Sequence, residues 1–186
     1  PFLNKYGGKK HPLDYQNAYQ LLVAVILSAR DSDRNINKIS PLLFARFPDM
    51  VALSRAEPED LLEIMGKVSN AKNKSRWLCD LARQLKKDEN IPGDMAGLTA
   101  LPGIGRKSAN VIMGELGYKM EGVMVDLHVL RVAPRLGLAT GKTPEKIEKE
   151  LMAAFPARQW KELGMALTHL GREVCRPRPK CTECIM

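Results

Sequence analysis

Apolar residues recur at helical spacing along most of the chain, and no stretch alternates polar and apolar residues as a half-buried strand does. Residues 15–30 are so apolar that little room remains for a polar face, which predicts a buried central helix. Further helices are expected over residues 34–47, 50–56, 58–65, 75–87, 95–100, 106–116, 127–136, 144–155 and 160–171. The pattern therefore predicts an all-α fold.

Several connections carry their own signals. The polar cluster at residues 28–33 can cap the following helix, and Pro41 is expected to kink or split that helix. Residues 66–74 read as a basic link that opens with glycine, and residues 1–13 show only weak helical periodicity.

The 186 residues suffice for one large domain or for two small lobes with a substantial core. A formal net charge of +8 favours a polyanionic partner, although the charge by itself fits nucleic acid, an acidic membrane or mere solubility. No apolar run approaches the roughly 20 residues that span a bilayer. No signal peptide is visible, and Pro1 is an unusual first residue, which leaves room for missing residues before it.

The stretch with the most chemical content is Leu101-Pro102-Gly103-Ile104-Gly105-Arg106-Lys107. Two glycines bracket one apolar residue between two helical patterns, so bare backbone N–H groups can approach a bulky anion. The N-terminus of the second helix adds free N–H groups and a partial positive charge. Helix, hairpin and helix together predict a sequence-independent grip on phosphate.

Lys107 and Asp126 are the candidate reactive residues. Lys107 falls in the first turn of the second helix, where the helix dipole is expected to lower its pKa and leave a nucleophilic amine. Asp126 directly precedes the next helix. Its plain interpretation is a helix cap, and the sharper one is a carboxylate that assists lysine attack at a sugar carbon.

Three of the four cysteines crowd the C-terminal tail, whereas Cys79 lies far away on an apolar helix face and reads as a core residue. Such a distribution is typical of a metal or cluster site in a reducing compartment, and the residues alone leave zinc or an iron–sulfur cluster open. The tail also holds basic residues interleaved with prolines, which suit phosphate contacts. The tail residues in question are Cys175, Arg176, Arg178, Lys180, Cys181 and Cys184.

The hairpin stretch, together with Val125-Asp126-Leu127-His128-Val129-Leu130-Arg131-Val132 and the tail cysteines, resembles the helix-hairpin-helix DNA glycosylase superfamily, and its endonuclease III branch in particular. The resemblance runs from about residue 15 to the end of the chain. It implies two helical lobes, residues 18–127 and residues 1–17 plus 128–186, with DNA in the cleft between them. It also implies that Lys107 forms a Schiff base with deoxyribose, that Asp126 is the catalytic carboxylate, and that DNA is contacted by Leu101, Gly103, Ile104, Gly105, Arg106, Ser108 and His128.

Two departures from the family concern how the duplex is read. Arg30 stands where endonuclease III has glutamine, at the position that fills the gap left by an extruded base. Arginine can also fill a gap and hydrogen-bond a base edge, or it can be an ordinary groove residue. Val68 is the candidate for the apolar wedge that the family inserts beside the extruded nucleotide, and a basic loop touching phosphates is the alternative.

The resemblance further implies a structural [4Fe–4S] cluster held by Cys175, Cys181 and Cys184. Five residues separate the first two of these cysteines, where the usual family spacing is six, and no fourth cysteine follows.

The expected function is that of a bifunctional base-excision-repair DNA glycosylase and AP lyase. It would act as a monomer, away from membranes, on double-stranded DNA that carries a damaged base, in particular an oxidised pyrimidine, or an abasic site. In a prokaryote it would work in the cytoplasm at the nucleoid. Alternatives are a mismatch-specific or otherwise specialised glycosylase, an adenine-removing enzyme that lacks nicking activity, and a non-catalytic DNA-binding module.

Overall fold

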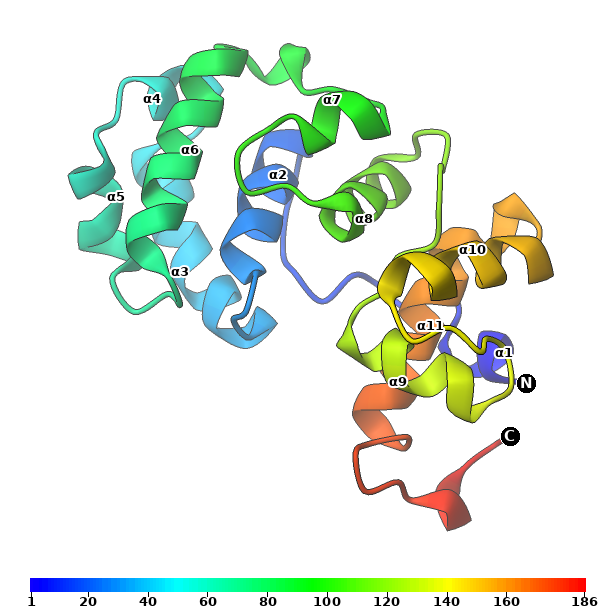
Figure 1. The fold of residues 1–186 in the computed structure, drawn as a ribbon. Helices are drawn as coiled ribbons and strands as arrows, with labels where there is room; N and C mark the ends of the chain where they lie inside the picture. The colour runs from blue at the N-terminus through cyan, green and yellow to red at the C-terminus, as the bar shows by residue number, and fades with distance from the viewer. The chain divides into compact units, whose positions relative to one another are not determined.

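A computed structural model describes residues Pro1–Met186, and all of its regular elements are helices (Figure 1). The prediction of an all-α fold is confirmed. The chain forms two compact units, which we call the hairpin unit (His11–Ile112) and the tail unit (Pro1–Lys10 with Met113–Met186). The lobe boundaries expected from the resemblance, at residues 18 and 127, stay a prediction.

The hairpin unit is built around α2 (Ala18–Ser28), in which every residue from Leu21 to Leu27 is buried. Asn17 caps this helix by accepting a 2.9 Å hydrogen bond from the Gln20 N–H. Six further helices and one 3₁₀ turn complete the unit, and Figure 1 shows α2 among them: α3 (Asp33–Arg46), α4 (Met50–Ser54), α5 (Pro58–Met65), α6 (Ala71–Leu85), η1 (Asp88–Asn90), α7 (Met95–Thr99) and the first part of α8 (Arg106–Leu116).

At α3 the predicted helix cap can be compared with the predicted effect of Pro41. Ser32 caps α3 by accepting a 3.2 Å hydrogen bond from the Asn35 N–H, as the polar cluster before the helix predicted. Pro41 does not split α3. Its missing N–H removes only one backbone hydrogen bond of the helix, and burial of Ile36 and Leu43 on the inner face keeps the helix in place.

Helix α6 begins four residues earlier than the sequence pattern predicted. Asn70 adopts a left-handed conformation at φ 59°, and its carbonyl accepts hydrogen bonds from the Asn73 and Lys74 N–H groups. The first turn, residues 71–74, is polar and basic, so the hydrophobic periodicity that marks a helix starts only after it.

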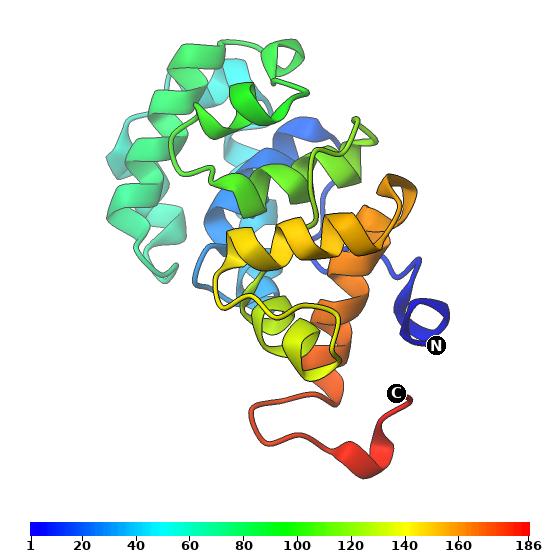
Figure 2. The ribbon, with the colours of Figure 1, turned by 45° about the vertical axis from the view of Figure 1, so that its right-hand side comes forward.

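The tail unit joins the two ends of the chain. Its elements are α1 (Phe2–Tyr6), the end of α8, α9 (Leu127–Arg135), α10 (Pro144–Ala154), η2 (Ala157–Gln159), α11 (Trp160–Glu173) and η3 (Cys181–Glu183). Helix α11 packs against α9 and against α1, so the first turn of the chain covers one of its last helices (Figure 2). Fully buried Val129, Leu163 and Leu167 lie in the core of this unit.

None of the helices is both long and apolar enough to cross a bilayer.

Candidate DNA-binding and catalytic site

The hairpin between α7 and α8 is a tight turn with its apolar side chains turned inward. Leu101 and Ile104 are 3% and 6% exposed, and the Ile104 N–H donates to the Leu101 carbonyl at 3.2 Å. Gly103 has φ +80°, and a Cβ added there would lie 2.8 Å from Cε3 of Trp77. The turn therefore requires glycine at 103 twice over, for its conformation and for the approach of the indole.

The start of α8 presents its backbone. Gly105 is exposed, has open space where a Cβ would be, and accepts the 2.9 Å hydrogen bond from the Ala109 N–H that begins the helix. The first N–H groups of a helix lack intrahelical acceptors. Bare backbone at Gly105 next to these donors is the arrangement that binds phosphate. Leu101 and Ile104, which are buried, can contribute to such a grip only through their backbone.

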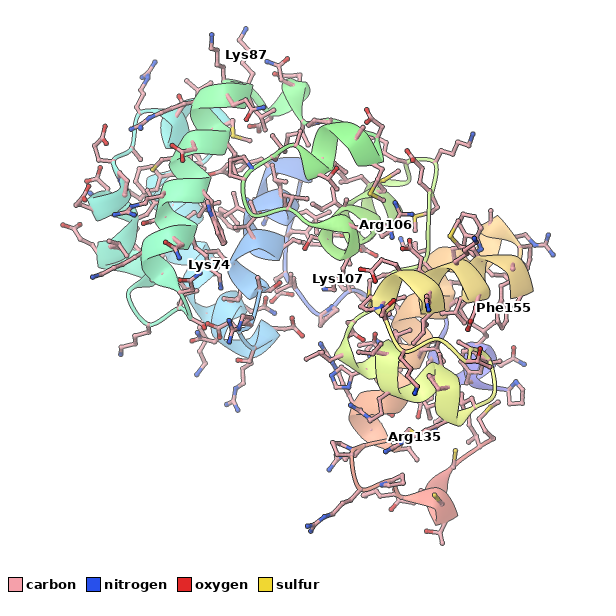
Figure 3. All side chains as sticks on the ribbon, viewed as in Figure 1. Lys74, Lys87, Arg106, Lys107, Arg135 and Phe155 are labelled. Atoms are coloured by element: carbon pink, nitrogen blue, oxygen red, sulfur yellow. The ribbon has the colours of Figure 1, made fainter.

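Lys107 lies in the first turn of α8, and its side chain is exposed, as is that of Arg106 (Figure 3). Ser108 is half-buried on the same turn. The hairpin thus places an accessible amine directly beside a backbone anion site.

Asp126 is the N-cap of α9. Its Oδ1 accepts hydrogen bonds from the His128 and Val129 N–H groups, each at 2.8 Å. Both bonds use the same oxygen, so the cap does not occupy Oδ2. The plain interpretation as a cap is therefore correct, and it is compatible with a second use of the carboxylate. The adjacent Leu127 is 78% exposed.

His128 is held between α9 and α11. Its Nδ1 lies 3.1 Å from Nη2 of Arg131, and the same Nη2 donates to the Gly171 carbonyl at 3.0 Å. Burial lowers the pKa of His128, and the positive charges of Arg131 and Arg172 lower it further, against the Asp126 carboxylate and a hydrogen bond to the Gly171 backbone. A neutral, packed imidazole is the result.

The two candidates for reading the duplex differ in accessibility. Arg30 is exposed and has a left-handed backbone at φ 59°. Val68 is only 4% exposed, and its N–H donates to the Met65 carbonyl at 2.8 Å. A side chain that is covered to this extent cannot enter a duplex in this conformation of the loop, so the burial weighs against Val68 as the wedge. The exposed side chains of the loop are Lys67, Ser69 and Asn70.

Two arginines of α9 hold the backbone of the cysteine tail. Arg131 Nε donates to the Cys175 carbonyl at 3.0 Å. Arg135 Nη1 donates to the Arg176 carbonyl at 2.7 Å, and its Nη2 donates to the Pro177 carbonyl at 3.2 Å. Arg135 also approaches the Cys175 sulfur, with Nη1 3.7 Å from Sγ. Sequence reasoning missed both roles, since nothing in the spacing of an arginine reveals a distant carbonyl.

The tail cysteines supply the soft donors that an iron–sulfur cluster takes, but they do not fit a cluster as they lie. Cys175 is buried at the apolar core of the tail unit, Cys184 packs against that core, and Cys181 is exposed. No three Cys, His, Asp or Glu side chains gather into a group that could hold a metal ion.

The basic residues of the tail differ in what they contact. Lys180 Nζ pairs with the Glu183 carboxylate at 3.0 Å, and Arg176 Nε donates to the Arg172 carbonyl at 3.0 Å. Arg178 is exposed. Cys79 is fully buried, and its burial raises the pKa of its thiol to about 11, which confirms its interpretation as a core residue.

Lys107 belongs to the hairpin unit and Asp126 to the tail unit. The structure defines the local surroundings of each, and it brings Asp126 together with His128 and Arg131 within one unit.

Comparison with known proteins is consistent across sequence and structure. Residues 23–157 match the family described as the HhH-GPD superfamily of base excision DNA repair proteins. Endonuclease III of Synechocystis sp. is 38% identical over 182 residues, which are 96% of this chain and 83% of that protein. Endonuclease III of Treponema pallidum is 34% identical over 183 residues, which are 94% of this chain and 83% of that protein.

Solved structures give the same picture. A trapped covalent intermediate of endonuclease III with DNA, described as an estranged-adenine complex, matches with a TM-score of 0.91 at 30% identity and covers 99% of this chain and 88% of that one. A thermostable thymine-DNA glycosylase matches with a TM-score of 0.78 at 20% identity, over 99% of this chain and 89% of that one, which shows the shared fold.

Proposed function

Because the chain belongs to the HhH-GPD superfamily of base excision DNA repair proteins, we propose a role for each residue of its site in glycosylase and lyase chemistry. The chain is a base-excision DNA glycosylase with AP lyase activity, similar to endonuclease III over nearly its whole length. The observation that carries the assignment of residues is the exposed Lys107 amine in the first turn of α8, directly after a hairpin with bare backbone.

The hairpin binds the DNA backbone in this proposal. The N–H groups around Gly105 and the positive end of α8 bind a phosphate without regard to sequence, and Arg106 adds charge. His128 supports the end of α9 that begins with Asp126. The tail residues Arg176, Arg178 and Lys180 add positive charge for the DNA backbone. Lys180 must first exchange its partner Glu183 for a phosphate, so it contributes least.

The chemistry begins on a base that has been turned out of the stack. The Lys107 amine, after it has lost its proton, attacks C1′ as the glycosidic bond breaks, and the base departs with the electron pair of that bond and takes up a proton. Asp126, through the oxygen that the cap leaves unused, stabilises the positive charge that develops on the sugar. Binding at the hairpin fixes the sugar against the amine, which removes much of the entropic barrier.

Strand cleavage follows from the covalent adduct. Loss of a proton from nitrogen and opening of the sugar ring leave a Schiff base between Nζ and C1′. The iminium makes the C2′ proton acidic, and removal of that proton expels the 3′ phosphate with the electron pair of the C3′–O bond. The products are a nicked strand and, after hydrolysis, the regenerated lysine.

The lesion that we propose is an oxidised pyrimidine. Arg30 keeps a second candidate in view, a glycosylase specialised for mismatched bases, because an exposed arginine with a fixed backbone can select the base opposite the lesion. We further propose that the protein acts as a monomer in the cytoplasm of a prokaryotic cell.

For the tail, we propose that Cys175, Cys181 and Cys184 come together, from the separate positions described above, to bind a [4Fe–4S] cluster whose remaining ligand is not among the residues of this chain. The thiolate donors and the paired spacing of the last two cysteines support this proposal. Iron and sulfide analysis of the purified protein, with visible absorption, tests it against zinc.

Borohydride trapping tests the catalytic assignment. Duplexes carry an oxidised pyrimidine, uracil, mismatched thymine or an abasic site, and borohydride reduces any Schiff base to a stable adduct. We expect an adduct on the oxidised pyrimidine and on the abasic site that is lost in Lys107→Ala. The adduct should be kept in Lys87→Ala, which changes a surface lysine between α6 and η1. Base release without any adduct would refute the role of Lys107, and absence of both would leave only a DNA-binding module.

A further inference from the structure

One lysine of the hairpin unit is buried although it has no role in the proposed catalytic reaction. Lys74, in the first turn of α6, is 1% exposed. Its Nζ donates to the carbonyls of Leu27 and Ala29, each at 2.6 Å. These carbonyls belong to the C-terminal end of α2, where a cation is favoured by the helix dipole and satisfies acceptors that the helix leaves open. Burial lowers the pKa of Lys74, and the Asp31 carboxylate opposes that effect.

The peptide that Lys74 holds is the one that leads into Arg30. The Ala29 carbonyl belongs to the bond between Ala29 and Arg30, so the hydrogen bond from Nζ fixes the plane of that peptide. Arg30 itself has φ 59°, a conformation that a residue with a side chain rarely adopts. Such a conformation persists only where the surroundings impose it. Here the imposed turn leaves the Arg30 side chain exposed.

The next residue, Asp31, ties this turn to the loop before α6. Asp31 Oδ2 accepts a hydrogen bond from the Ser69 N–H at 2.7 Å, across 38 residues of sequence. Its Oδ1 accepts from the Ser32 N–H at 2.7 Å and from the Asn35 side chain at 3.0 Å. Burial alone would raise the pKa of Asp31, but these three donors, together with the charge of Lys74, lower it.

Hydrogen bonds from Lys74 and to Asp31 therefore hold the turn between α2 and α3 and the loop before α6. Both segments lie at the end of the hairpin unit where α2 leads into α3 and α6 begins (Figures 1 and 3). Lys74 reaches from α6 to the α2–α3 turn, and Asp31 reaches from that turn back to Ser69. Together the two side chains tie the backbone on either side of Arg30 to α6 and to the loop before it, and we call this pair of contacts the bracket.

We propose that Lys74 and Asp31 are positioning residues, which hold Arg30 in one orientation and thereby set how strongly the enzyme distinguishes the base opposite the lesion. The inference rests on the proposed function, in which Arg30 faces the duplex. A guanidinium has only donors, so it favours bases that present adjacent acceptors. That preference has effect only if the guanidinium cannot turn toward other bases. The bracket restricts the backbone of Arg30 and so limits the directions that its side chain can take.

Single-turnover base release tests the proposal. Four duplexes carry the same oxidised pyrimidine opposite adenine, cytosine, guanine or thymine, and the rates give a ratio between the best and the worst opposite base. We expect Lys74→Met and Asp31→Ala to lower that ratio by about tenfold or more, the discrimination that one bidentate contact supplies. Lys87→Met, which removes an exposed lysine from the connection between α6 and η1, should leave the ratio unchanged.

A double-mutant cycle separates positioning from general damage. Arg30→Ala should lower the ratio as Lys74→Met does, and the double variant should lower it no further, because both changes remove the same contact. A merely structural lysine would reduce the rates on all four duplexes equally and would add to the Arg30 effect.

The outcomes are distinct from those for the proposed function. If the wild-type enzyme releases no base from any duplex, the proposed function fails. If it releases bases without distinguishing the opposite base, or if folded Lys74→Met keeps the full ratio, the positioning role is refuted. Should Lys74→Met not fold, as judged by circular dichroism, the half-exposed Asp31→Ala decides the question by the same criterion.

Discussion

Replacing Gly103 with alanine should destabilise the hairpin unit by two additive causes. The φ of +80° at this position costs a residue with a side chain about 1–2 kcal/mol. The added Cβ also lies 2.8 Å from Cε3 of Trp77, closer than packed carbon atoms come, and relief of such overpacking costs about 1–3 kcal/mol. The expected loss is thus about 2–5 kcal/mol, a large share of the ~5–15 kcal/mol that stabilises a typical domain.

Gly105→Ala is the matched control, because it lies two residues away in the same hairpin, and an added Cβ there has open space. Its cost should stay below about 1 kcal/mol, since only the weak cap preference is lost. Urea unfolding followed by tryptophan fluorescence measures both variants, in a Trp160→Phe background so that Trp77 alone reports. If Gly103→Ala unfolds within about 0.5 kcal/mol of Gly105→Ala, the packing argument for the turn is wrong.

Three further predictions concern single side chains. Asp126→Asn should keep the helix cap but slow base release by about 100-fold or more, whereas Asp126→Ala should lose about 1 kcal/mol of stability as well; unfolding and single-turnover assays separate the two effects. Because burial lowers the pKa of His128, its neutral form contributes stability that is present above the ordinary pKa of 6.5 and is lost as pH falls through the folded value, so thermal unfolding of His128→Gln should depend less on pH on the acid side. In protein from which any bound metal has been removed, exposed Cys181 should react with iodoacetamide at neutral pH, while buried Cys79, with its pKa raised to about 11, should react only after unfolding, as mass spectrometry of the labelled protein would reveal.

Local patterns predicted most helices, because their signals lie within one or two turns. A proline at the start and acidic residues in the first turn placed the beginning of α5 at Pro58, where the structure has it. The hairpin between α7 and α8 could also be predicted from the sequence, since two glycines around one apolar residue have few structural uses.

What the sequence did not reveal depends on contacts between distant segments. Lys74 is one of several lysines in a basic stretch, and charged residues are ordinarily exposed, so nothing local marks it as buried. Its burial follows from carbonyls that lie 45 and 47 residues away. The burial of Val68 was not predicted for the related reason that the exposure of a loop residue is decided by the segments that pack over it.

The pairing of α1 with α11 has a consequence for how the protein is made. The hairpin unit is one continuous stretch, so it can fold on the ribosome as soon as it has emerged. The first ten residues must instead wait for α11, which ends at Glu173 and is complete roughly 3–12 s after Ile112 at ~5–20 residues per second. During that interval the N-terminal helix has no partner, and the nascent chain presents Phe2 and Tyr6, both buried in the finished protein, to chaperones.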